Sequence, residues 1–110
     1  MNRLASFFYE VLATARDESS GRAWAEWLLS KHLADVIAAG AMSARLVKLD
    51  EPARTYAAQY EFESREAFDR YVRDHAPRLR AEGIELFGDR LMYTRRTGEI
   101  VKGGSSPVHS

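Results

Sequence analysis

Alternation of apolar and polar side chains predicts four β-strands in this chain, at residues 5–14, 41–49, 54–62 and 90–97. The stretch 54–62 alternates most regularly. One of its faces carries Tyr56, Ala58, Tyr60 and Phe62, and the other carries Thr55, Ala57, Gln59 and Glu61. The stretch 5–14 is apolar on both faces, so we expect it to lie centrally in a sheet and to need cover on both sides.

Helical spacing of apolar residues separates the first two strands. Between residues 22 and 31, Trp24, Trp27 and Leu28 stand at positions i, i+3 and i+4, which predicts one buried stripe. Beyond Lys31 the apolar residues spread around the helix. This spread predicts a break or a change of direction near His32, followed by a short second piece that ends at Gly40.

The second helical segment follows Ser64, whose hydroxyl suits an N-cap. Its expected buried stripe consists of Phe68, Tyr71, Val72, His75 and Leu79. Pro77 has no N–H to donate within a helix, so the helix should kink or restart there, with Pro77 in the first turn of the second piece. Gly83 is expected to end that piece.

The predicted order of strand, helix, strand, strand, helix, strand is the split βαβ arrangement of ferredoxin-like α+β domains. Such a domain has a four-stranded antiparallel sheet with both helices on one face. The other face stays bare in a single copy, although here it carries Ala57 and half of the apolar first strand. We therefore expect a homodimer in which a second copy covers the open face. Residues 1–97 are expected to form the domain and residues 98–110 a flexible tail.

Composition and charge exclude several classes of function. The 16 basic and 16 acidic residues balance to a formal net charge of zero, which gives no general electrostatic reason to bind nucleic acid or an anionic membrane. The chain has no cysteine, which excludes disulfides, thiolate catalysis and cysteine-ligated metals. No apolar run approaches the ~20 residues of a membrane helix. Without a secretory signal pattern, a cytoplasmic location is expected.

Several motifs taken together resemble a known family. They are WAEWLLSKHLADVIAAG at residues 24–40, TYAAQY at 55–60, HAPRLRAEG at 75–83 and FGDR at 87–90. Their combination is similar to the domain-of-unknown-function 4286 family of small bacterial proteins, over nearly the whole chain apart from the tail. The resemblance implies a ferredoxin-like fold of the dimeric α/β-barrel type and no known activity. One departure is Ala34, where similar sequences commonly have a proline.

Two histidines are the candidates for proton transfer in catalysis. His32 and His75 can exchange protons near neutral pH, and each stands at an expected helix irregularity. They could line the mouth of a cavity, or each could hydrogen-bond a backbone group freed by the irregularity. The histidines lack metal-binding spacing, and no phosphate-loop, dinucleotide-binding or hydrolase motif occurs, so neither a metal nor a cofactor is expected.

Aromatic and amide side chains are the candidates for ligand binding. Trp27, Tyr60 and Tyr71 could line a pocket for a planar ligand such as a quinone or haem, or they could be ordinary core residues. Gln59 points toward the expected partner sheet, where it could line a dimer cavity or bond its symmetry mate. Three arginines near the last strand could bind an anion or oppose edge aggregation: Arg90, Arg95 and Arg96.

Two functions from different classes fit these observations. The first is a non-enzymatic homodimeric module that binds a small apolar or aromatic ligand, or a protein partner. The second is implied by the resemblance, because some dimeric α/β barrels are cofactor-independent monooxygenases, isomerases or haem-degrading enzymes. For this second function the residues to test are His32, His75, Trp27, Tyr60 and Gln59. Both functions share one fold, so the fold alone does not separate them.

Overall fold

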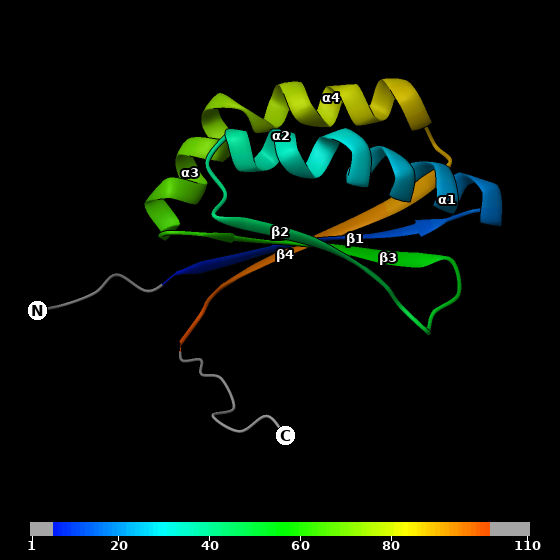
Figure 1. The fold of residues 1–110 in the computed structure, drawn as a ribbon, viewed down its shortest axis with the longest axis horizontal. Helices are drawn as coiled ribbons and strands as arrows, with labels where there is room; N and C mark the ends of the chain where they lie inside the picture. Colours follow the sequence, from blue (N-terminus) through cyan, green and yellow to red (C-terminus); the bar gives the residue numbers. More distant parts are fainter. Residues whose placement is uncertain (1–5, 102–110) are drawn as a thin grey trace, which may run out of the picture.

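A layer of helices lies on one face of a four-stranded sheet in the computed structural model, which describes residues 6–101 (Figure 1). The strands are β1 (Phe7–Ala15), β2 (Ser43–Lys48), β3 (Thr55–Phe62) and β4 (Leu91–Glu99). The helices are α1 (Glu18–Trp27), η1 (Leu28–His32), α2 (Leu33–Ala38), α3 (Arg65–Asp74) and α4 (Ala76–Phe87). This order confirms the predicted ferredoxin-like α+β fold.

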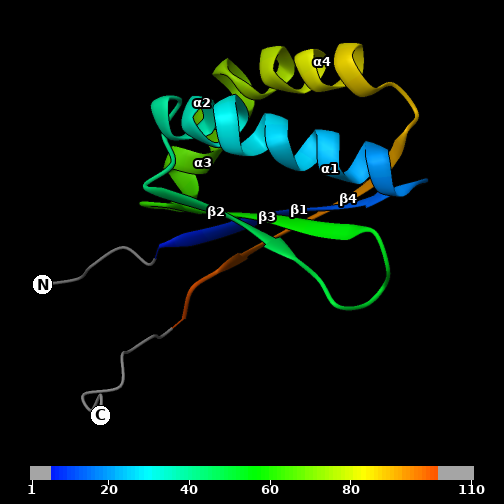
Figure 2. The ribbon, with the colours of Figure 1, turned by 45° about the vertical axis from the view of Figure 1, so that its right-hand side comes forward.

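The sheet has the strand order β2-β3-β1-β4, and every neighbouring pair is antiparallel. The strand with two apolar faces, β1, is central, as its pattern predicts. A turned view shows the helices still on one side of the sheet, with no element covering the other (Figure 2). The described residues therefore leave one sheet face open.

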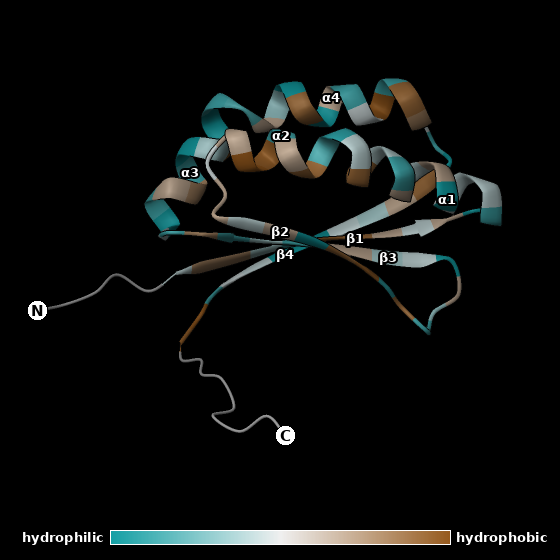
Figure 3. Ribbon diagram, viewed as in Figure 1, coloured by the Kyte–Doolittle hydropathy of each residue, from teal (hydrophilic) through white to brown (hydrophobic). Residues whose placement is uncertain are grey.

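The core lies between the sheet and the helices. Alternate residues of β1 and β3 enter it, among them Phe7, Tyr9, Tyr56, Tyr60 and Phe62. The helices contribute Trp24, Leu28, Val36, Tyr71 and Leu79. Hydrophobic and hydrophilic residues alternate in short blocks along α1 and α4, as expected for helices with one buried stripe (Figure 3).

The first helical segment contains an irregularity where the sequence places one. It begins at Asp17, whose carboxylate accepts from the Ser20 N–H at 2.8 Å. Instead of the expected break near His32, Leu28–His32 forms a π-helix that joins α1 to α2 without interruption. A π-helical turn carries the chain past the change in apolar pattern while most backbone N–H groups stay bonded.

The second helical segment restarts where Pro77 requires it. Ser64 caps α3 by accepting from the Ala67 N–H at 3.1 Å. The segment is interrupted at His75, and Pro77 lies in the first turn of α4, both as predicted.

The prediction that Gly83 ends α4 is wrong. The helix continues to Phe87, and Gly88, with φ of 56°, ends it. Gly83 lies inside α4 and faces the Trp27 ring: a Cβ at Gly83 would lie 3.4 Å from Trp27 Cη2, an ordinary van der Waals contact. A glycine inside a helix is indistinguishable in one sequence from a glycine that ends it.

The last strand is longer than the alternation indicates. β4 runs to Glu99, and the Ile100 N–H donates to the Ser6 carbonyl at 2.9 Å. The first residues of the stretch expected as a tail are thus paired with the sheet. Residues 1–5 of the predicted domain and 102–110 of the predicted tail lie outside the described residues.

Candidate functional site

A row of polar side chains crosses all four strands on the open sheet face. The strand register pairs Arg45 with Gln59, Gln59 with Glu10, and Glu10 with Arg96. Arg45 Nε donates to Gln59 Oε1 at 2.7 Å, and Gln59 Nε2 donates to Glu10 Oε2 at 2.9 Å. Arg96 Nε donates to Glu10 Oε1 at 2.6 Å. These four residues, the polar row, form one continuous hydrogen-bonded line.

The carboxylate at the centre of the polar row is buried although it faces away from the helices. Glu10 is 3% exposed. Burial opposes its ionisation, yet hydrogen bonds from Gln59 and Arg96 and the charge of Arg96 together hold the pKa of Glu10 below its usual value. Glu10 is therefore an ionised, fully bonded group at neutral pH.

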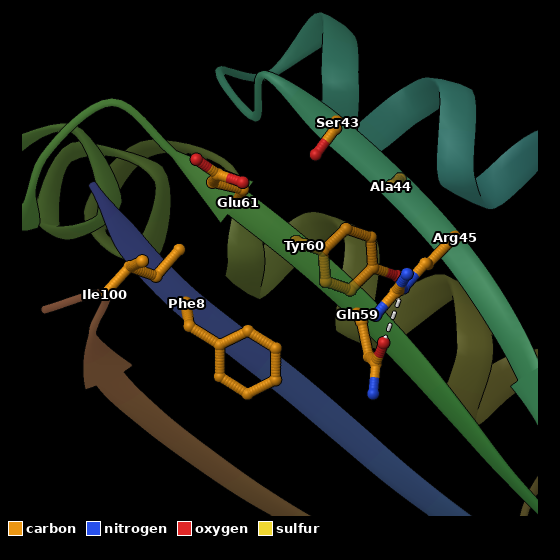
Figure 4. A pocket seen from close by; sticks show the side chains of 8 residues that line it. All are labelled: Phe8, Ser43, Ala44, Arg45, Gln59, Tyr60, Glu61 and Ile100. Atoms are coloured by element: carbon orange, nitrogen blue, oxygen red, sulfur yellow. Dashed lines mark hydrogen bonds between the residues drawn. The ribbon is translucent and has the colours of Figure 1, made fainter. Parts of the chain in front are cut away.

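Apolar and small side chains flank the polar row. In the next register row, Leu12 stands opposite Ala57, and Ala57 opposite Val47. A hollow of about 340 Å³ lies on the other side of the row, next to Phe8 (Figure 4). A second hollow of about 440 Å³ lies over Leu12 and Ala57. The open face is thus a mixed surface, on which the polar row lies between two hollows that polar and apolar side chains both line.

A second candidate site lies on the helix side of the sheet. We call it the helix–sheet cleft: a cavity of about 160 Å³ between α1, α4, β1 and β4. Its described lining residues are Val11, Trp24, Trp27, Leu79, Arg80, Gly83, Ile84, Tyr93 and Arg95. The rings of Trp24 and Tyr93 lie 6.1 Å apart, centroid to centroid. The cleft therefore combines aromatic walls with two guanidinium groups.

Two side chains of the helix–sheet cleft carry buried donors without a partner. They are Trp27 Nε1 and Arg80 Nε. The bond that Arg80 does make is long, from Nη2 to the Tyr9 hydroxyl at 3.3 Å. A buried donor without an acceptor costs about 1 to 3 kcal/mol, so its presence in a fold calls for a reason.

His32 lies against the back of the cleft residue Trp27. Their rings are stacked at 4.4 Å, and His32 Nδ1 is buried without a hydrogen-bond partner. Burial is the main reason that the pKa of His32 falls from 6.5 to about 4, because the nearby carboxylates of Asp35 and Glu82 only partly offset it. His32 is accordingly neutral at physiological pH.

His75 occupies a different part of the molecule, the junction between α3 and α4. Its Nδ1 lies 3.0 Å from Arg78 Nη2. It borders a hollow of about 220 Å³ that also contacts Gly40 and Arg70. The structure therefore does not bring the two candidate histidines to one cavity.

The two candidate tyrosines belong to a buried aromatic cluster beneath α3. Tyr60 and Tyr71 are each 3% exposed, and their rings lie 5.5 and 6.2 Å from that of Tyr9. Burial raises the pKa of Tyr71 to about 12 and raises that of Tyr60 further. Both phenols stay protonated at neutral pH, which suits core residues with one polar end.

The residues singled out in the sequence therefore lie in four places. Trp27 and His32 stand together at the helix–sheet cleft, Tyr60 and Tyr71 in the core cluster, His75 at the α3–α4 junction, and Gln59 in the polar row. The expected single pocket lined by Trp27, Tyr60 and Tyr71 is not among the cavities of residues 6–101.

Sequence reasoning missed three residues of these sites: Glu10, Arg45 and Arg80. An acidic residue within an apolar strand was the available signal for Glu10, because such a residue must be exposed or paired. The adjacent arginines Arg95 and Arg96 were grouped as one cluster. Strand alternation instead sends Arg95 to the helix–sheet cleft and Arg96 to the polar row.

Two classes of site are absent from the part of the chain that the structure covers. In residues 6–101, no three His, Asp or Glu side chains gather in a way that could hold a metal ion. The helices of the same residues are too short or too polar for any to cross a membrane.

Comparisons with known proteins show the family and the fold. A family model described as "Domain of unknown function (DUF4286)" matches residues 6–101. A comparison with curated protein sequences gives no match. A solved dimeric ferredoxin-like protein from an uncultured marine organism has a TM-score of 0.71 at 10% identity, over 91% of this chain and 99% of its own.

Two further solved structures have described activities. SnoaB, a cofactor-independent oxygenase from Streptomyces nogalater, has a TM-score of 0.64 at 14% identity, over 94% of this chain and 99% of its own. A haem-degrading protein from Mycobacterium tuberculosis has a TM-score of 0.62 at 15% identity, over 93% of this chain and 99% of its own. At these identities the likeness shows a shared fold.

Proposed function

Because this chain belongs to the DUF4286 family of domains of unknown function, we propose its role from its own geometry: a non-enzymatic homodimeric module that binds a small aromatic ligand. The observation that carries the proposal is the helix–sheet cleft. It has aromatic walls, and buried donors on Trp27 and Arg80 have no partner among residues 6–101. A ligand acceptor that reached these donors would remove their cost.

The size of the cleft favours a small ligand. Its volume of about 160 Å³ is below the roughly 300–1,000 Å³ of pockets that hold drug-sized ligands. An apolar cavity of about 150 Å³ in another protein holds benzene. A ligand with a single aromatic ring therefore fits the cleft better than haem does.

The open sheet face supports the homodimer. It combines the polar row with the apolar neighbours Phe8, Leu12 and Val47, and Met92 on the same face is 78% exposed. Because Glu10 at the centre of the row is already paired with Arg96, a like surface can cover it without leaving that carboxylate unpaired. The dimeric state described for a protein of the same fold supports the same arrangement.

Light scattering on the purified protein tests the dimer. The expected result is twice the chain mass at micromolar concentration. Leu12→Glu and Met92→Glu, on the open face, should each give a monomer, whereas Leu86→Glu, at an exposed position of α4, should leave the dimer intact. A monomeric wild type, or a Leu12→Glu dimer as stable as the wild type, contradicts the proposed assembly.

A second candidate function is a cofactor-independent monooxygenase, isomerase or haem-degrading enzyme. The observation that favours it is the same pair of buried donors, because preorganised N–H groups can stabilise an oxyanion on a substrate. Neither His32 nor His75 lines the helix–sheet cleft, so this site has no histidine base at hand.

Native mass spectrometry of protein purified from its own host separates the two functions. For the binding module we expect a dimer that carries an unchanged small aromatic molecule. Incubation of that molecule with protein and oxygen should then consume no oxygen and form no product. Conversion of the bound molecule to a product would refute the binding module and support the enzyme.

A further inference from the structure

The helix–sheet cleft carries an unbalanced positive charge. Among its described lining residues are two arginines, Arg80 and Arg95, and no acidic side chain. Within residues 6–101, neither guanidinium forms an ion pair with a carboxylate. Arg95 instead lies over the Tyr93 ring, 5.7 Å from its centroid.

Unpartnered donors and aromatic rings line the same cleft as the two charges. Arg80 has a buried Nε without a partner, and Trp27 on the facing helix has a buried Nε1 without a partner. Guanidinium N–H groups bind a carboxylate through two parallel hydrogen bonds, and the indole N–H is a further donor. The half-buried rings of Trp27 and Tyr93 supply apolar surface against which a flat ligand can pack.

From this combination we propose that the helix–sheet cleft binds a small aromatic carboxylate, with its ring against Trp27 and Tyr93 and its carboxylate on Arg80 and Arg95. The inference rests on the proposed function and names the chemical class of its ligand. A single ring with one carboxylate matches the volume of about 160 Å³. The two arginines favour the carboxylate, the aromatic lining favours the ring, and the volume of the cleft limits the size of the ligand.

Binding of benzoate and of benzamide tests the proposal directly. The two probes have nearly the same shape, and only benzoate is charged. The chain has two tryptophans, both in the cleft lining, so tryptophan fluorescence and the two indole N–H signals of a ¹⁵N-labelled sample report on the site. We expect benzoate to shift the Trp27 indole signal and to bind at least about tenfold more tightly than benzamide.

Charge-removing variants locate the carboxylate. Arg95 is exposed on β4, so the Arg95→Met variant should fold. It should weaken benzoate binding about tenfold without changing benzamide binding. Arg80→Met should act in the same direction. Arg78→Met is the matched control, because Arg78 lies on the same helix and does not line the cleft; it should bind both probes as the wild type does.

Each outcome distinguishes this inference from the proposed function. Equal affinity for benzoate and benzamide would refute the claim that the ligand carries a carboxylate. The proposal of a small aromatic ligand would remain. Benzoate binding that survives in both Arg95→Met and Arg80→Met also overturns the inference, because the anion then lies elsewhere. If neither probe moves the Trp27 signal at millimolar concentration, the inference is overturned, whereas the ligand-binding role is decided separately by native mass spectrometry of the host-purified protein.

Discussion

Replacement of Glu10 by alanine is the sharpest stability test that the structure offers. Glu10 accepts two hydrogen bonds, from Gln59 Nε2 at 2.9 Å and from Arg96 Nε at 2.6 Å, and it is 3% exposed. Glu10→Ala removes the acceptor for both donors. Gln59 keeps its bond from Arg45 but loses the partner of its amide nitrogen.

The two bonds differ in their contribution to the free energy of unfolding. A hydrogen bond to a charged acceptor contributes about 1.5–3 kcal/mol, which applies to the part-buried bond from Gln59. The Arg96 side chain is 76% exposed, so solvent screens its ion pair to about 1 kcal/mol or less. We therefore expect Glu10→Ala to cost about 3 kcal/mol and Arg96→Ala to cost about 1 kcal/mol or less.

The pH dependence has a definite sign. The pKa of Glu10 is lower in the folded chain than its usual 4.5, so the unfolded chain binds the proton more readily. The stabilisation is complete above pH 4.5 and is lost as the pH falls through the lower folded pKa. The free energy of unfolding of Glu10→Ala should therefore fall less on acidification than that of the wild type.

Urea unfolding in the Met92→Glu background measures these values, because the proposed dimer would cover Arg96 and would make apparent stability depend on concentration. Wild type, Glu10→Ala, Arg96→Ala and the double variant form a cycle whose coupling energy should be about 1 kcal/mol or less. The reasoning is refuted if Glu10→Ala costs less than Arg96→Ala, or if both variants retain the acid dependence of the wild type.

Further predictions concern the glycines of α4 and the buried histidine. Gly83→Ala should stabilise the protein by about 0.5–1 kcal/mol, because a Cβ there meets Trp27 at an ordinary 3.4 Å and alanine favours the helix. Gly88→Ala should destabilise it by about 1–2 kcal/mol, because φ is 56°; thermal unfolding compares the two, and equal signs would contradict the packing argument. The pKa of His32 falls from 6.5 to about 4 on folding, so the unfolded chain binds more protons between these values, and stability should drop by about 3 kcal/mol as the pH is lowered through that window. His32→Phe keeps a ring against Trp27 and should remove this drop in urea unfolding; an NMR titration midpoint of His32 above pH 6 would disprove the assignment.

Short-range patterns determined most of the fold. Period-two alternation placed Gln59 on the face opposite Tyr60, and the two apolar faces of 5–14 put that strand at the centre of the sheet. The cap at Ser64 and the restart at Pro77 also followed from local chemistry. These features depend on neighbours within a few residues, so one sequence suffices to predict them.

The candidate sites depended on contacts that one sequence does not display. The polar row joins Glu10 to residues 49 and 86 positions away, and the helix–sheet cleft joins Trp27 of α1 to Arg80 of α4. Gly83 reads as a helix stop until the Trp27 ring is seen to pack on it.

By itself, the sequence determined the element types and which residues share a sheet face, because these follow from residue periodicity. Only the tertiary structure decided which charges are paired, which buried donors lack a partner and where a ligand has room. Pairing and desolvation depend on distances of a few ångströms between residues far apart in the chain, and those distances are set when the helices pack on the sheet.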